Sequence, residues 1–346
     1  MSPNETSNEH VSDLQRPIMK PKLICLTPVK NEAWVLGLFL KCTSLWADHI
    51  IIADQNSTDG SQDIARKYPK VRLIENKTKE FNEPERQKML IDEARKIEGP
   101  RILFALDADE LFTANYLHSN DWQKIIHSKP GDVFGFQWAN ITPTKDKYFL
   151  SSFYFPWVMN DDGTEHKNHV RYIHSMRIPY PIEADKGYYH VEDFKVFHLN
   201  YLYERRLKSK NRFYQCIEKT RESNSNFVSA YRSHHFQKNT DLLIPEEWLE
   251  GYKKQAIAIF NGLNFSETYF WFDLDVIELF KKYGFSKFKY LDVWDKEWMA
   301  QMEGFLKIED PRNLFIKLLH FYLRSSQIFY RSFIIKAIDK VLKSFS

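Results

Sequence analysis

Short runs of consecutive apolar residues alternate with stretches of helical periodicity in the first third of the chain. Such runs, bounded by turn residues, are typical of buried strands. Four of them occur, at Lys22–Val29, His49–Asp54, Val71–Glu75 and Arg101–Leu106. Strands that alternate with helices of about 10–15 residues indicate a largely parallel sheet with helices on both faces. The pattern therefore predicts an α/β fold.

Helices are predicted between these strands. From Val35 to Leu45, apolar residues recur at helical spacing, and a short helix is predicted at residues 61–69. A longer helix is predicted at Asn82–Pro100. Pro84 would lie in its first turn, where the helix needs no backbone N–H, and Gly99 just past its end, so both ends of this helix carry their own signals.

The pattern is less regular after Phe112. Residues 133–138, 169–178 and 194–202 alternate as strands do. Residues 143–168 are rich in aromatic side chains and are predicted to form one long loop. Loops of that length are usually functional or disordered. Because of its aromatic content, we expect this loop to contact a ligand. Residues 244–305 are predicted to be mainly helical.

The two ends of the chain differ from its body. Residues 1–20 are polar, unlike a secretory signal, and are predicted to be a disordered leader. The sequence contains no run of about 20 apolar residues, so no transmembrane helix is predicted. Residues 311–346 contain seven Lys and Arg and one acid, whereas the rest contains 42 basic and 45 acidic residues. This distribution argues against a general nucleic-acid binder and for one basic attachment segment.

The basic tail is predicted to form amphipathic helices. One apolar stripe has four members: Ile338, Val341, Leu342 and Phe345. Three lysines lie on the opposite face: Lys336, Lys340 and Lys343. Upstream lies another apolar stripe: Leu314, Leu318, Phe321 and Tyr322. Such a segment fits an interfacial helix on anionic lipid, and a helix pair packed on its own domain is the alternative.

We divide the chain into the leader (1–20), an α/β domain (21–235), a helical accessory region (236–310) and the basic amphipathic helices (311–346). The three cysteines are odd in number and have no metal-like spacing: Cys25, Cys42 and Cys216. They indicate a reduced, cytosolic compartment.

The stretch FALDADELF (Phe104–Phe112) places acids at the end of a buried strand. Asp107 and Asp109 are two residues apart, so their side chains point to the same side. Two carboxylates held together repel unless a cation intervenes. Mg²⁺ or Mn²⁺ prefers oxygen ligands and keeps positions open for substrate phosphates. A divalent-metal site is predicted here, with a solvated acidic turn as the alternative.

Polar residues also follow two other predicted strands, from Thr27 to Glu32 and from Asp54 to Asp59. In open parallel sheets, ligands bind outside the carboxyl ends of the strands. Asp54 can accept hydrogen bonds from a nucleobase imide or a ribose hydroxyl, or it can cap the turn that follows it. Three polar strand ends together predict a ligand site.

These motifs resemble the inverting glycosyltransferases of family 2, which have the GT-A fold. The resemblance rests on LTPVKNE, HIIIADQNSTDG, FNEPERQKMLIDEAR and FALDADELF, in the family's order over residues 22–112, and is weaker from about 133 to 215. It implies a Rossmann-like, mostly parallel sheet, here with a helical C-terminal extension. It also implies a nucleotide-diphosphate sugar donor and a glycan or lipid-linked acceptor, without nucleic acid. We expect a cytoplasmic enzyme of surface polysaccharide or glycolipid synthesis, with an anionic membrane surface as a further partner.

The resemblance also assigns residues. It implies nucleotide-sugar contacts for eight of them: Thr27, Pro28, Asn31, Glu32, Asp54, Asp59, Arg86 and Asp107. It implies Mn²⁺ or Mg²⁺ as cofactor, with three ligands: Asp107, Asp109 and His198. A metal between the donor phosphates stabilises the charge that develops when the sugar–phosphate bond breaks.

The catalytic base follows less directly, because the acceptor hydroxyl must lose a proton to a nearby carboxylate and the family's pattern is altered here. Many members carry Glu-Asp before a helix, whereas Glu192 and Asp193 lead into a predicted strand. Some bacterial relatives carry a His-Glu pair upstream of the metal histidine. Glu183 falls near that place, with Ile182 where the histidine would be. We choose Glu183 over Asp193 as the general base.

Three other functions were weighed. A haloacid-dehalogenase-type phosphatase would usually carry Thr or Val where Leu111 stands, and a sugar nucleotidyltransferase would open with a Gly-rich loop that LTPVKNE does not provide. A catalytically inactive sugar-binding or scaffold protein is the non-enzymatic alternative, against which the strand-end acids and His198 argue. The basic run Arg205–Arg212 is either a solvated helix face or a segment that meets phosphates or an anionic acceptor.

Overall fold

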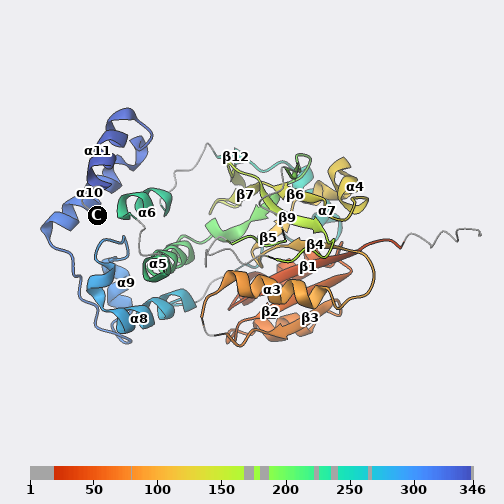
Figure 1. Cartoon of the computed structure of the whole chain (residues 1–346), viewed down its shortest axis with the longest axis horizontal. Helices are drawn as coiled ribbons and strands as arrows, with labels where there is room; N and C mark the ends of the chain where they lie inside the picture. Colours follow the sequence, from red (N-terminus) through yellow and green to blue (C-terminus); the bar gives the residue numbers. More distant parts are fainter. Residues whose placement is uncertain are drawn as a thin grey trace, which may run out of the picture.

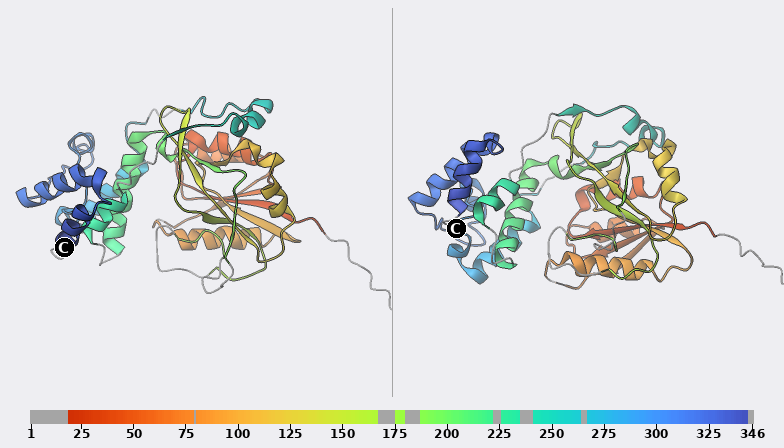
Figure 2. Two further views of the ribbon diagram at one scale, coloured as in Figure 1. Left: turned by 90° about the horizontal axis from the view of Figure 1, so that it is seen from above. Right: turned by 45° about the horizontal axis from the view of Figure 1, so that its top comes forward.

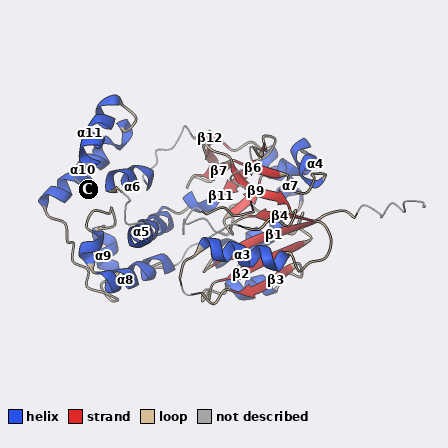
Figure 3. Cartoon of the chain, viewed as in Figure 1, coloured by secondary structure: helices blue, strands red, loops and turns tan. Residues whose placement is uncertain are grey.

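The computed structural model describes residues 19–78, 80–166, 175–179, 187–221, 226–234, 241–263 and 267–343. A domain built around sheets lies beside a group of helices (Figure 1). The strands belong to the sheet domain (Figure 3). Two further views show the C-terminal group of helices at one end of the molecule and not over the sheets (Figure 2). The predicted leader falls almost wholly outside the described residues.

The main sheet has the order β10-β6-β9-β4-β1-β2-β3 within the described chain. Four parallel strands follow the predicted apolar runs: β1 (Lys22–Val29), β2 (His49–Asp54), β3 (Val71–Glu75) and β4 (Arg101–Ala105). The other three extend the sheet beyond β4: β6 (Val133–Phe136), β9 (Phe155–Asn160) and β10 (Tyr189–His190). Because β9 runs antiparallel to β4 and β6, the sheet is mixed but rich in parallel pairs.

Helices cover both faces of this sheet because alternate strand residues point to opposite sides. Leu23 and Cys25 of β1 face the core that includes α1 (Ala33–Thr43), whereas Ile24 and Leu26 face α3 (Glu83–Ala94). The short α2 (Ser61–Arg66) packs beside α1. Asn82 caps α3, accepting the backbone N–H of Glu85. The predicted α/β class and the helical C-terminal extension are confirmed.

A second sheet has the order β12-β8-β7-β11-β5 among the described residues. Its strands are short: β5 (Glu110–Phe112), β7 (Trp138–Ile141), β8 (Lys147–Leu150), β11 (Val196–His198) and β12 (Leu242–Leu243). The prediction of one long loop at 143–168 is wrong, because β8 and β9 lie within it. Its aromatic residues Tyr148, Phe149 and Trp157 are buried, so they belong to the core.

Smaller elements flank these sheets: η1 (Ala114–His118), α4 (Asn120–Ile126), η2 (Leu199–Tyr201) and α7 (Glu247–Lys254). The helical part contains the remaining elements: α5 (Glu204–Arg221), α6 (Phe227–His234), α8 (Trp271–Tyr283), η3 (Phe285–Phe288), α9 (Lys296–Gln301), α10 (Leu314–Ser326), η4 (Gln327–Phe329) and α11 (Phe333–Lys343). Helix α5 packs along α8, and Phe213 and Cys216 of α5 share a core with Val276 and Phe280 of α8. None of the described helices is long and apolar enough to cross a bilayer.

Candidate functional site

A cleft opens where β1 and β4 end, and we call it the strand-end cleft. Five elements or their flanks contribute to it: the turn after β1, the start of α3, the turn after β4, the middle of α5 and the start of α8. Its lining is Pro28, Lys30, Glu32, Phe81, Glu83, Arg86, Asp107, Ala108, Asp109, Lys210, Tyr214, Trp271 and Phe272. Five residues predicted from sequence are therefore brought together: Pro28, Glu32, Arg86, Asp107 and Asp109.

Asp109 is buried at the base of this cleft. Its Oδ2 has no hydrogen-bond donor among the described residues, and Nη1 of Arg206 lies 3.7 Å from it. Burial alone would raise the pKa of Asp109, but Lys210, His198 and Arg206 together lower it to about 2. Asp109 is thus an ionised carboxylate with one oxygen free to bind a cation.

His198, at the end of β11, interacts electrostatically with the same acid but does not line the strand-end cleft. Its Nδ1 lies 2.8 Å from Oδ1 of Asn140, and its ring stacks on Trp138. With the amide oxygen as acceptor, Nδ1 carries the proton and Nε2 keeps its lone pair. Burial lowers the pKa of His198 to about 4, although Asp109 opposes that shift. The imidazole is therefore neutral at pH 7, as a metal ligand must be.

Asp107 is held by a residue that sequence reasoning missed. Nη2 of Arg177 lies 2.7 Å from Oδ2 of Asp107, and Nη1 of the same guanidinium lies 2.6 Å from Oε2 of Glu110. Burial and the nearby Asp107 raise the pKa of Glu110 to about 7, although Arg177 opposes that shift. Arg177 therefore balances two acids of the DADE segment at once.

Glu32 forms the opposite wall of the strand-end cleft. Its Oε1 pairs with Arg206, and its Oε2 accepts the indole N–H of Trp34 at 2.6 Å. Burial raises the pKa of Glu32 to about 7, because it outweighs the attraction of Arg206, and Asp109 adds to the rise. Arg206 thus lies between two carboxylates, Glu32 and Asp109.

Three cations lining the cleft come from separate segments. Arg86 lies in the first turn of α3 and has its guanidinium over the ring of Phe81. Lys210 projects from α5. Lys30 lies over the ring of Trp271 and 2.9 Å from Oδ2 of Asp275, which ties the start of α8 to the β1 turn. The cleft itself encloses only about 60 Å³.

Four other predicted residues support the strand ends and are not part of the cleft lining: Thr27, Asn31, Asp54 and Asp59. Thr27 is fully buried, with Oγ1 3.6 Å from Sγ of Cys25. Asp54 accepts the backbone N–H of Ser57 and the amide of Gln62 through Oδ2, while its buried Oδ1 has no partner within the described ranges. Their predicted donor contacts stay predictions.

Asn31 and Asp59 shape the turn after β1. Asn31 has φ +54°, a left-handed conformation that Asn tolerates better than most residues, and its Oδ1 accepts the backbone N–H of Thr58. Asp59 accepts the backbone N–H of Ala33 at 2.8 Å, so it satisfies the start of α1. Both residues hold the turn that places Glu32, and their direct contact with a donor stays a prediction.

The two candidate bases are not joined to the strand-end cleft by the described structure. Oδ2 of Asp193 accepts the backbone N–H of Asp121 and the hydroxyl of Ser119, so its carboxylate serves the start of α4. Glu183 lies outside the described residues.

Only some of the cationic residues of the site were predicted from the sequence. The basic run Arg205–Arg212 contributes Arg206 and Lys210, which confirms that part of it is no solvated face. Arg177 carried no sequence signal, because its partners are about 70 positions away in the chain and meet it only in the folded state.

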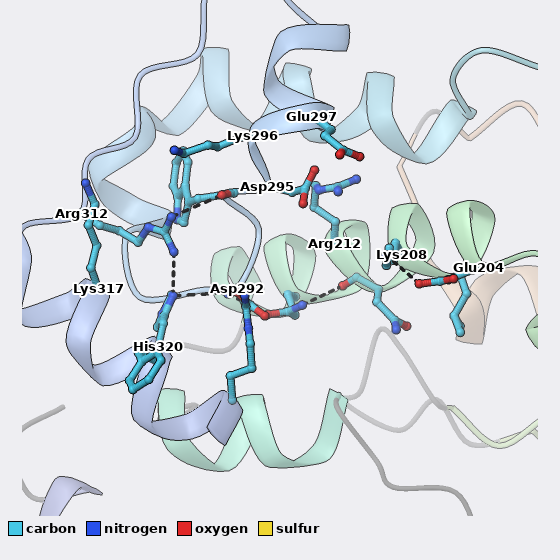
Figure 4. Close-up of a pocket in the computed structure, with 16 residues that line it drawn as sticks. Glu204, Lys208, Arg212, Asp292, Asp295, Lys296, Glu297, Arg312, Lys317 and His320 are labelled. Carbon is cyan, nitrogen blue, oxygen red and sulfur yellow. Dashed lines mark hydrogen bonds and ion pairs between the residues drawn. The ribbon is translucent and has the colours of Figure 1, made fainter. Parts of the chain in front are cut away.

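A larger cavity of about 960 Å³ lies between α5, α9 and α10 (Figure 4). Its charged residues largely pair with acids: Lys208 with Glu204 at 2.8 Å, Arg312 with Asp310 at 2.9 Å and Arg324 with Asp292 at 3.5 Å. The predicted site residues do not line it. It is therefore separate from the strand-end cleft.

A divalent cation is compatible with the strand-end cleft. Among the described side chains, no group of three His, Cys, Asp or Glu is arranged to hold a metal ion by itself. Asp109 offers an oxygen that accepts no hydrogen bond from the described residues, and His198 offers Nε2. Mg²⁺ commonly binds through one or two protein ligands plus substrate phosphates, so these two residues fit a metal that also binds a phosphorylated ligand.

Residues 25–184 match the sequence profile described as glycosyl transferase family 2. Comparison with curated proteins found no match. Several solved structures show remote similarity, including the following three. Glucosyl-3-phosphoglycerate synthase from Mycobacterium tuberculosis, in complex with Mn²⁺, uridine diphosphate and glucosyl-3-phosphoglycerate, has 14% identity over 35% of this chain, and the match spans only 44% of that chain, with a TM-score of 0.27.

The other two are similarly remote. TarS 1-349 of S. aureus has 12% identity over 94% of this chain and 92% of that chain, with a TM-score of 0.35. A 4-diphosphocytidyl-2C-methyl-D-erythritol synthase from Anaerococcus prevotii has 15% identity over 41% and 71%, with a TM-score of 0.25. At these TM-scores the solved structures support no conclusion about this chain, so the evidence for a glycosyltransferase is the family profile over residues 25–184.

Proposed function

We propose that the chain, whose residues 25–184 match the glycosyl transferase family 2 profile, is a glycosyltransferase of GT-A fold that uses a divalent metal to transfer a sugar from a nucleotide-diphosphate donor. The transfer inverts the anomeric centre, and the acceptor is a glycan or a lipid-linked sugar of surface polysaccharide or glycolipid synthesis.

The observation that carries this proposal is the state of Asp109. It is buried and ionised, has one oxygen without a hydrogen bond from the described residues, and interacts electrostatically with His198, whose Nε2 carries the lone pair of the imidazole. Asp109 and His198 would hold Mn²⁺ or Mg²⁺, with Asp107 beside them. When bound, the ion stabilises the negative charge that builds on the leaving diphosphate.

The protein's own cations would share that task. Arg86 lies at the N-terminal turn of α3, where the helix dipole also favours phosphate. Lys210 projects into the strand-end cleft from α5. Both would orient the diphosphate and offset its charge in a site where burial strengthens each interaction. Asp54, with its unpartnered Oδ1, would accept a hydrogen bond from the nucleoside.

Glu183 would remove the acceptor proton as general base, with Asp193 as the alternative. The capping bonds of Asp193 favour Glu183, since a carboxylate that serves a helix start is less free to take up a proton. The enzyme would act in the cytoplasm, held peripherally at the membrane that carries its acceptor.

Hydrolysis of a panel of nucleotide sugars, with and without Mn²⁺, tests the proposal. We expect Mn²⁺-stimulated release of nucleoside diphosphate from one donor class. Asp109→Asn should reduce it by about 10³-fold, because several kcal/mol of charge stabilisation are lost. Asp63→Asn, at an exposed position on α2, is the matched control and should leave the rate unchanged. Full Mn²⁺-dependent turnover by Asp109→Asn would contradict the metal assignment, and donor binding without turnover by the wild type would favour the inactive sugar-binding alternative.

A further inference from the structure

The C-terminal helices expose an unusual amount of apolar surface. Half of the twenty large hydrophobic residues that are exposed in the described chain lie between Leu314 and Val341. On α10 they include Leu318 and Phe321, the latter 70% exposed, and on α11 they include Phe333 at 86% and Ile334. We call this surface the α10–α11 face. Such an accumulation of exposed apolar side chains on two consecutive helices is a candidate site for contact with a partner or a membrane.

Packing of the helices on their own domain does not account for this face. A different set of α10 residues, Ile316, Leu319 and Leu323, is buried, and two of these pack against Phe227 and Tyr231 of α6. Helix α10 is therefore apolar on two sides, and among the described residues only one of these sides is packed in a core.

A buried ion pair holds α11 against α6. Arg232 of α6 donates to both carboxylate oxygens of Asp339, at 2.9 and 3.0 Å, and also to the carbonyl oxygen of Leu323 on α10. Tyr322 donates to Asp339 as well, at 3.0 Å. The exposed side chains therefore stand on an ordered support, which means that the face is preformed.

The exposed charges of residues 311–343 have one sign, although Lys317 and Arg324 pair with Asp310 and Asp292, which lie outside this segment. Asp339 is the single acid after residue 310, and it is buried in the pair with Arg232. The exposed charges of this segment are all cations: Lys317, Arg324, Arg331, Lys336, Lys340 and Lys343. A second copy of the chain on this face would bring two such sets together and repel. An anionic surface with an apolar interior satisfies both the charges and the apolar side chains.

We propose that the α10–α11 face docks on an anionic lipid bilayer, with Phe321, Phe333 and Ile334 inserted at the level of the headgroups and the lysines on anionic lipid. The strand-end cleft contains no residue of α10 or α11, so docking leaves it accessible. The proposal deepens the proposed function by naming the membrane surface at which acceptors would be met, yet docking requires neither donor nor metal.

Sedimentation with vesicles tests the docking. The full chain is mixed at low salt with vesicles of phosphatidylcholine containing about a third phosphatidylglycerol, and with pure phosphatidylcholine vesicles. We expect binding to the anionic vesicles, weakened at least about tenfold by 0.5 M salt because screening removes the electrostatic part. Nucleotide-sugar hydrolysis, measured in solution without vesicles, reports the proposed function separately.

Matched variants locate the surface. Phe321→Ser combined with Ile334→Ser should lower vesicle affinity at least about tenfold, since each inserted side chain contributes apolar burial. Phe153→Ser is the control, because Phe153 is also 70% exposed but lies in the sheet domain. Lys336→Gln with Lys340→Gln should weaken binding to anionic vesicles only. Absence of binding by the wild type, or equal binding by Phe321→Ser/Ile334→Ser, overturns the proposal. A wild-type dimer that ignores vesicles and that the double variant converts to a monomer also overturns it, in favour of a second copy.

Discussion

Around the strand-end cleft charged side chains are buried, whereas along α10 and α11 apolar side chains are exposed. Asp109, Glu110 and Arg206 lie inside the protein at one place, and Phe321 and Phe333 lie in solvent at the other. Buried charges and exposed apolar side chains each make the isolated chain less stable than buried apolar and exposed charged side chains would. Sequences keep such violations mainly at functional sites. The comparison indicates that both regions are built for something that the chain itself does not supply.

In both regions an arginine pairs with buried carboxylates. In the strand-end cleft, Arg177 neutralises Asp107 and Glu110, and in the helical part Arg232 neutralises Asp339. The two pairs differ in their surroundings. Near Arg177, an oxygen of Asp109 accepts no hydrogen bond within the described part of the chain. The Arg232 guanidinium, in contrast, donates all of its hydrogen bonds, to Asp339, Leu323, Ser326 and Gln327. The first cluster can accept a ligand, and the second is complete and structural.

Breaking the structural pair should give the largest effect on stability. Asp339→Asn leaves the Arg232 charge buried without its counter-charge, and we expect a loss of about 3–5 kcal/mol in the free energy of unfolding of the helical part. Urea denaturation and amide hydrogen exchange of α11 measure it. Asp63→Asn, at an exposed pair with Arg66, should cost less than about 1 kcal/mol. Equal effects of the two substitutions would show that the Arg232 pair does not hold α11.

Two neighbouring leucines on α10 sharpen the contrast between buried and exposed apolar residues. Leu319 is 6% exposed and packs in the α6–α10 core, whereas Leu318 is 58% exposed. Leu319→Ala should cost about 2–5 kcal/mol because it leaves a cavity. Leu318→Ala should stay within about 0.5 kcal/mol in the absence of lipid. The midpoint of thermal unfolding distinguishes them, and a large loss for Leu318→Ala would mean that this side of α10 is packed in solution.

A smaller effect is expected from the residue behind His198. Asn140→Ala removes the acceptor that fixes the imidazole tautomer, and such substitutions typically lower metal affinity by about 10–100-fold. Mn²⁺ affinity measured by calorimetry in the presence of uridine diphosphate provides the test. Asn115→Ala is a suitable control, because its amide donates to the backbone carbonyl of Asp193 and not to the strand-end cleft. Unchanged Mn²⁺ affinity in Asn140→Ala would separate His198 from the metal.

Much of the sheet domain could be predicted from local pattern. The predicted bounds of β1, β2 and β3 agree with the structure, because each strand is a continuous apolar run that ends in turn chemistry. The predicted helix at Asn82–Pro100 is α3, which ends earlier, at Ala94. The aromatic segment at 143–168 was misread, since alternation around Trp157 is broken by polar and proline positions that suggest a loop.

The site was predictable only where it lies at strand ends. Asp107, Asp109 and Glu32 follow buried strands, and parallel strands bring such ends together. Arg177 comes from a segment without regular structure, and Tyr214 from a helix far along the chain. Their positions depend on tertiary packing that has no local signature. The tail was predicted as amphipathic, but its pattern did not show that α10 would be apolar on two sides.

The excess of cations on α10 and α11 has a consequence for the behaviour of the purified protein. At low ionic strength the cations of neighbouring molecules repel and keep the exposed phenylalanines apart. The Debye length falls from about 10 Å at 0.1 M to about 3 Å at 1 M salt, so added salt removes this colloidal protection while strengthening apolar contacts. Solubility should therefore decrease as salt is added, and dilute buffers or mild detergent are the conditions in which the molecule stays dispersed.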